Sequence, residues 1–190
     1  MLISEAQREM RSAFLGGFMG QLVSALLWAV AAGLATWGSQ STSIVFLLVA
    51  GIFIFPLTQL GLRLIGRPGR VDKGNNLCSL GAQVAFVLPL SLPIVGAATL
   101  YRTEWFFPAF MVALGAHYVP FVFLYGMRMF AALGALLWTG GLVLGLWIDA
   151  PFSTGAWFTA TVLIAFAWLG RRLTLLEESA ASGPEMAPRF

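Results

Sequence analysis

The chain has 190 residues, of which 59% are hydrophobic and only 10% are charged. Soluble domains carry about 25% charged residues, so this composition excludes a protein that is soluble alone and predicts a membrane domain. The net charge of +3 comes mostly from arginines at the edges of apolar segments, where anionic lipid is found, so nucleic acid is not an expected partner. The single cysteine, Cys78, excludes an intrachain disulfide and a metal site built from several thiolates.

Residues 1–13 are polar and of mixed charge, and they predict an amphipathic cytoplasmic lead-in. They lack the apolar region and cleavage site of a signal peptide, so we expect the first span to be retained. Six apolar segments follow, each about long enough to cross the roughly 30 Å core of a bilayer, over residues 14–37, 44–65, 77–100, 108–125, 130–147 and 154–170. We therefore expect one transmembrane domain over 14–172 and a disordered cytoplasmic tail over 173–190.

The positive charges predict how these spans are oriented. If the first turn is external, only Arg102 among the 11 Lys and Arg residues falls on the side opposite the termini. Lys and Arg are retained on the cytoplasmic side, which predicts an all-α multi-pass protein of the bacterial inner (plasma) membrane, with six transmembrane helices and both termini inside. An independent aromatic belt marks the predicted outer boundary, at Trp37, Tyr101, Trp105, Trp147 and Trp157.

The first and last pairs of spans resemble each other weakly. Residues 25–28 and 135–138 both read Ala-Leu-Leu-Trp, and in each case a second Trp follows nine residues after the first. Duplicated hairpins of this kind build transporters and channels, whereas residues common in every span also produce such matches by chance. The sequence leaves both interpretations open.

Polar side chains inside the spans are the candidate functional residues, because they are costly to place in lipid. Gln21, Gln59 and Gln83 lie on three different spans, all in the predicted cytoplasmic half. They could line a vestibule that opens to the cytoplasm. They could equally form hydrogen bonds between helices, each contributing about 0.6 kcal/mol, and we place this structural interpretation first.

His117, the only histidine, lies near the middle of the fourth span, three residues before Pro120. An imidazole there could relay protons or bind a solute, with Tyr118 as a neighbour. Alternatively, a neutral ring hydrogen-bonds to a Gln, a Ser or a carbonyl group of the next helix. Internal prolines kink the second, third and fourth spans, so we expect any site to lie among them, with Arg63 and Arg128 at its cytoplasmic mouth.

Several chemistries lack the residues that they need. No Asp or Glu lies within a predicted span, which disfavours proton- or sodium-coupled transport. Walker A, HExxH and GxSxG patterns are absent. We therefore expect no enzyme activity, no catalytic residues, no metal site and no cofactor.

Three segments of the chain are similar to an uncharacterised bacterial family of small multi-span membrane proteins, a domain of unknown function. They are residues 51–59, 89–93, and 115–118 with 125–128, and the resemblance extends over roughly residues 16–147. It implies a bacterial membrane protein and transfers no catalytic or binding residue.

Two functional hypotheses follow from these patterns. The first is a facilitative channel or carrier for a small solute that contacts His117 and the glutamines. The second is a non-transporting accessory or sensor protein that binds partner helices or lipid, with the arginine-rich loop 66–76 as its docking element. The expected partners are the lipid bilayer, an unidentified solute and, in a bundle this small, further copies of the chain.

Overall fold

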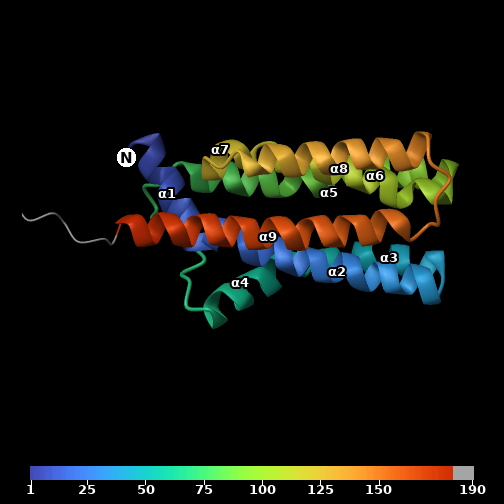
Figure 1. Ribbon diagram of the computed structural model, residues 1–190, viewed down its shortest axis with the longest axis horizontal. Coiled ribbons are helices and arrows are strands. Elements are labelled where there is room, and N and C mark those ends of the chain that lie inside the picture. Colours follow the sequence, from blue (N-terminus) through green and yellow to red (C-terminus); the bar gives the residue numbers. More distant parts are fainter. Residues whose placement is uncertain (182–190) are drawn as a thin grey trace, which may run out of the picture.

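The computed structural model describes residues 1–181, and helices make up nearly all of that range (Figure 1). The α-helices are α1 (Ile3–Phe14), α2 (Phe18–Trp37), α3 (Gln40–Gly51), α4 (Ile54–Leu64), α5 (Leu77–Tyr101), α6 (Phe106–Tyr118), α7 (Phe121–Tyr125), α8 (Met129–Leu146) and α9 (Thr154–Ala181). Short 3₁₀ turns at Leu15–Gly17 and Thr103–Trp105 precede α2 and α6.

Five of these helical stretches are long and apolar enough to cross a membrane, and α3 with α4 makes a sixth if the bent pair counts as one span. Apart from α1 and α4, the axes of these helices run along the length of the molecule (Figure 1). The expected all-α polytopic architecture is therefore confirmed. The ends of α1 and α9 lie at the same end of the bundle, which we call the terminal end, and the opposite end is called the far end.

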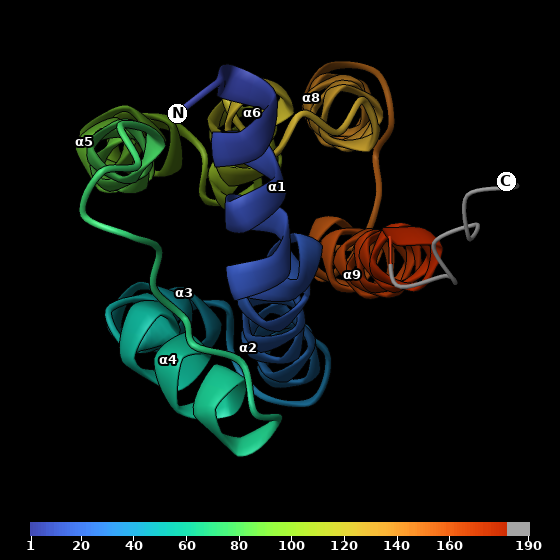
Figure 2. The same ribbon diagram turned by 90° about the vertical axis from the view of Figure 1, so that its left-hand side faces the viewer.

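Helix α1 lies across the terminal end, from α6 toward α2 (Figure 2). It turns away from α2 because Leu15, Gly16 and Gly17 all have positive φ, a conformation that glycine adopts without strain. Its apolar face is buried through Ala6, Met10 and Ala13, while its other faces carry charged groups. The predicted lead-in is thus an amphipathic helix that covers the end of the bundle.

Glycines let the long helices approach closely. A Cβ on Gly115 of α6 would lie 2.7 Å from the Gly134 carbonyl oxygen of α8, and one on Gly134 would lie 2.8 Å from the Gly115 oxygen. In the same way, a Cβ on Gly16 would lie 2.6 Å from the carbonyl oxygen of Gly170 in α9. These small residues therefore serve packing within the chain, as is common between membrane helices.

Two of the predicted proline kinks are real breaks between helices. Helices α3 and α4 meet at 59°, and Pro56 lies in the first turn of α4, where its missing N–H costs nothing. Pro120 separates α6 from α7, and the Val119 N–H bonds to the Ala116 carbonyl instead, at 3.2 Å. Helix α5, by contrast, continues through Pro89 and Pro93.

The predicted aromatic belt gathers at the far end, where α2, α5 and α8 finish. Trp37 and Trp157 lie with ring centroids 6.2 Å apart, and Trp157 Nε1 donates to Thr36 Oγ1 at 3.1 Å. Arg102, the one cation predicted for this side, lies 5.7 Å from the ring centroid of Trp105. Exposed amphipathic rings at one level are typical of a membrane boundary.

The prediction of a disordered tail over 173–190 is wrong for its first part. Helix α9 continues to Ala181, because Thr174 is buried and the carboxylates of Glu177 and Glu178 form ion pairs with distant arginines. Residues 182–190 lie outside the described range. The predicted hairpin duplication stays a prediction, although the matching tryptophans differ in setting: Trp28 is 2% exposed and Trp138 is 46% exposed.

Candidate functional site: an arginine pocket at the terminal end

The three candidate glutamines lie in three different settings. Gln21 of α2 is only 3% exposed, its amide lies beside Gly17 and the Phe130 ring, and within residues 1–181 neither polar atom has a hydrogen-bond partner. Gln83 is exposed on α5, which packs mainly against α6. Gln59 lies in α4, with its carboxamide oxygen against Gly69. The shared vestibule considered from the sequence stays a prediction.

The His117 ring of α6 packs edge-on against Tyr118 and Phe121, with ring centroids 5.7 and 5.1 Å away. Nδ1 has no partner in the described part of the chain. Tyr118 is buried and stacks on Phe130, with centroids 6.2 Å apart. Both sequence interpretations of His117 therefore stay predictions.

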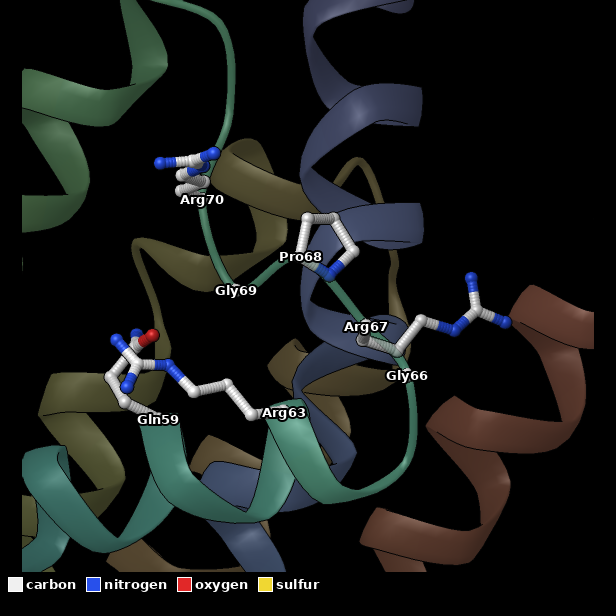
Figure 3. A pocket seen from close by; sticks show the side chains of 7 residues that line it. All are labelled: Gln59, Arg63, Gly66, Arg67, Pro68, Gly69 and Arg70. Atoms are coloured by element: carbon white, nitrogen blue, oxygen red, sulfur yellow. The ribbon is translucent and has the colours of Figure 1, made fainter.

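Two of the candidate residues do line one pocket, of about 550 Å³, at the terminal end (Figure 3). Gln59 and Arg63 come from α4, one helical turn apart, and their side chains lie next to each other. The remaining lining comes from the loop after α4, namely Gly66, Arg67, Pro68, Gly69 and Arg70. We call this set the arginine pocket.

The loop holds its shape through backbone contacts. The Arg67 N–H donates to the Leu62 carbonyl at 2.9 Å, and Leu62 itself is fully buried, so the end of α4 is fixed. Gly66 and Gly69 have φ of 74° and 59°, which allow the chain to turn back on itself. The Gly69 N–H donates to the Ala13 carbonyl at 3.3 Å and so ties the loop to α1.

The three arginines of the pocket have different electrostatic surroundings. Arg67 binds Glu178 of α9 through both outer nitrogens, at 2.6 and 2.8 Å, and this raises the pKa of the guanidinium. Its side chain points toward α9, away from Arg63 (Figure 3). Arg63 and Arg70 form no ion pair and no side-chain hydrogen bond within the described residues. Among the described residues, no acidic side chain lines the pocket.

A second group of contacts at the same end fixes α1, and we call it the α1 clasp. Arg11 donates to both carboxylate oxygens of Glu177, at 2.7 and 2.6 Å, and also to the carbonyl of Tyr125. Gln7 donates to the Phe123 carbonyl at 2.6 Å. Arg128, predicted to lie at the mouth of a pathway, is exposed beside this clasp in a separate pocket of about 380 Å³.

The Glu9 side chain extends the α1 clasp to the loop before α5. Its carboxylate accepts from the Asp72 N–H at 2.6 Å and from Asn75 Nδ2 at 2.9 Å. Asn75 is buried and also donates to the Ala6 carbonyl at 3.1 Å. Helix α1 is therefore joined to loop 66–76, to α7 and to the end of α9.

Two unpaired guanidinium groups beside a carboxamide can bind an oxyanion, because arginine matches phosphate and carboxylate geometry with paired donors. Groups of His, Cys, Asp and Glu suited to a metal ion are not found in residues 1–181. The sequence identifies Gln59 and Arg63 as candidates, but as parts of a solute pathway. It also shows that loop 66–76 is rich in arginine. It does not show that the chain reverses at Gly66 and Gly69 and so brings Arg70 to the same pocket.

Comparison with known proteins gives one result. The model of a family of unknown function, DUF7010, matches residues 3–172, which agrees with the resemblance to an uncharacterised family drawn from three shorter segments. No curated protein and no solved structure matches the chain.

Proposed function

The chain belongs to DUF7010, a family of unknown function, and we propose that it is a non-transporting accessory membrane protein that binds anionic lipid headgroups at its terminal end. One observation carries this proposal: within residues 1–181, Arg63 and Arg70 form no ion pair, and the pocket that they line together with Gln59 has no acidic lining. We further propose that the terminal end faces the cytoplasm, as the distribution of Lys and Arg predicts.

The position of α4 supports a lipid as the source of the anion. Leu60 and Leu64 are exposed apolar side chains on the same short helix that presents Arg63 to the pocket, and the exposed Ile65 directly follows it. A helix that carries both exposed apolar and cationic side chains lies at the boundary of headgroups and acyl chains, with its cations at the level of the phosphates. An anionic lipid could thus place its phosphate in the pocket and its chains against α4.

The experiment compares lipid retention by purified protein. Native mass spectrometry after exchange into phosphatidylcholine or into phosphatidylglycerol should show preferential retention of phosphatidylglycerol. The double variant Arg63→Gln, Arg70→Gln should lose this preference by about 30-fold, since each arginine near a lipid surface contributes about 1 kcal/mol. Arg128→Gln removes one positive charge at the same end, outside the pocket, and should retain the preference.

Equal retention of both lipids by the unaltered protein would contradict the proposal. Inorganic phosphate serves as the second probe. If inorganic phosphate binds to the pocket but phosphatidylglycerol does not, the pocket binds a free anion, and the proposal that the anion comes from a lipid is wrong.

Passage of a small polar solute is the second candidate, favoured by the buried Gln21 amide without a partner. We propose to test it with Gln21→Cys in a Cys78→Ser background, because Cys78 is exposed and would itself react. Rapid modification by a small water-soluble thiol reagent would show that water reaches α2. No modification in the folded protein would remove the support that this candidate has.

A further inference from the structure

We propose that Glu178 is an internal competitor of the anionic headgroup: it occupies Arg67, and a headgroup that enters the arginine pocket displaces it and loosens α1. This inference rests on the proposed headgroup binding and adds its regulation. The relevant element is one side chain with two alternative partners. Arg67 contributes to the wall of the pocket, but its guanidinium is turned to α9 (Figure 3).

The two partners exclude each other. Both outer nitrogens of Arg67 are engaged by the Glu178 carboxylate, and Nη1 also donates to the Ser12 carbonyl at 3.2 Å. A phosphate in the pocket needs the same paired donors, since arginine binds carboxylate and phosphate with one geometry. Arg67 therefore serves either Glu178 or the ligand.

The Arg67 side chain can exchange Glu178 for a ligand without rearrangement of the backbone. The side chains of Arg67 and Glu178 are 20% and 33% exposed, so water reaches the pair, and partly exposed ion pairs are only weakly favourable. The backbone of Arg67 stays anchored to Leu62 in either case. Only the side chain has to rotate, toward a pocket where Arg63 and Arg70 already attract an anion.

The exchange reaches α1 because Glu178 and Arg67 both bind the same residue of that helix. Ser12 Oγ donates to Glu178 at 2.7 Å, and the Ser12 carbonyl accepts from Arg67. Loss of the Arg67–Glu178 pair thus removes contacts that tie α1 to the loop and to α9, while the Arg11–Glu177 pair is untouched. By linkage, whatever weakens the docking of α1 at this point must strengthen ligand binding by the same factor.

The test is Glu178→Gln, with Glu177→Gln as the matched control. Both changes remove one carboxylate from the same turn of α9, but only Glu178 binds a pocket arginine. Titration of the detergent-purified protein with phosphatidylglycerol should give a Kd about tenfold lower for Glu178→Gln, as expected for one additional charge-assisted contact. Glu177→Gln should bind as the unaltered protein does.

A second measurement uses the unaltered protein, so that the proposal can be tested even if the Glu178→Gln variant folds poorly. Amide hydrogen exchange in α1 should become faster when phosphatidylglycerol is added and should not change with phosphatidylcholine. If the unaltered protein binds phosphatidylglycerol but α1 exchange is constant, or Glu178→Gln binds no more tightly, the competition is wrong and headgroup binding stands. If the unaltered protein shows no preference for the anionic lipid, the proposed function fails first.

Discussion

Four arginines at the terminal end fall into two pairs with opposite surroundings. Arg11 and Arg67 are 14% and 20% exposed, and each forms a bidentate pair with a glutamate more than a hundred residues away. Arg63 and Arg70 are exposed and have no ion-pair partner in the described range. The difference shows that one cationic surface contains both arginines that hold the fold together and arginines available to bind a ligand. The residue type alone does not distinguish the two kinds.

The paired set depends on the turn that brings α1 across the bundle, so the largest effect is expected there. Gly16 has a φ of 62°, and a Cβ on it would lie 2.5 Å from Thr174 Oγ1 and 2.6 Å from the Gly170 carbonyl oxygen. We expect Gly16→Ala to lower the free energy of unfolding by roughly 3 kcal/mol or more, through strain and overlap combined. Thermal unfolding in detergent measures this change.

Gly20→Ala is the matched control for that turn. Gly20 lies one helical turn further along α2, where the nearest atoms to a new Cβ, on Thr58, are at 3.8 Å. Alanine also favours helix over glycine by about 1 kcal/mol, so this variant should be neutral or slightly stabilised. Equal loss of stability in both variants would mean that the turn at residues 15–17 has no special part in the fold.

Removal of a paired arginine should lower the free energy of unfolding by less than the Gly16→Ala change in the turn. Arg11→Ala takes away both contacts to Glu177 and the contact to the Tyr125 carbonyl, and leaves the carboxylate with only the exposed Arg8, at 3.7 Å. We expect a loss of about 2 kcal/mol in the free energy of unfolding. Arg128→Ala, at the same end and exposed, should change it by less than about 0.5 kcal/mol. Similar values for the two variants would contradict the division into paired and free arginines.

Acid should weaken only the paired set. The pKa of Glu177 is held below its ordinary value of 4.5 because Arg11 donates to the carboxylate, and Arg67 lowers the pKa of Glu178 in the same way. Both carboxyls lie beyond Arg171 and Arg172, after the apolar part of α9. A lowered pKa in the folded state means that the stabilisation is complete above pH 4.5 and disappears as the pH falls through the lowered value.

The acid effect should be small, since both glutamates are about one-third exposed and water screens them. We expect on the order of 1 kcal/mol for the two pairs together. The protection factors of the α1 amides, which correct for the slower intrinsic exchange in acid, should fall between neutral pH and a pH below 4.5. The double variant Glu177→Gln, Glu178→Gln should show low protection throughout, without this acid-dependent step. A step of equal size in that variant would assign the acid effect to other groups.

The sequence predicts the spans well because apolar length and Lys and Arg position act locally along the chain. Boundaries of α2, α5 and α8 agree with prediction to within a few residues. The sequence does not predict the helical end of α9, because Glu177 and Glu178 are held there by Arg11 and Arg67, which are distant in the sequence. The pocket was half identified: Gln59 and Arg63 share a helix face, whereas Arg70 reaches them only through two positive-φ glycines.

The free arginines should show the smallest change in intrinsic stability. In lipid-free detergent, the double variant Arg63→Gln, Arg70→Gln should unfold within about 0.5 kcal/mol of the unaltered protein, because neither side chain has an ion-pair partner among residues 1–181. Added phosphatidylglycerol should then raise the unfolding temperature of the unaltered protein and leave the variant unchanged, since a ligand stabilises only the state that binds it. A variant that is already destabilised without lipid would place Arg63 and Arg70 among the structural contacts, and the contrast with Arg11 and Arg67 would be lost.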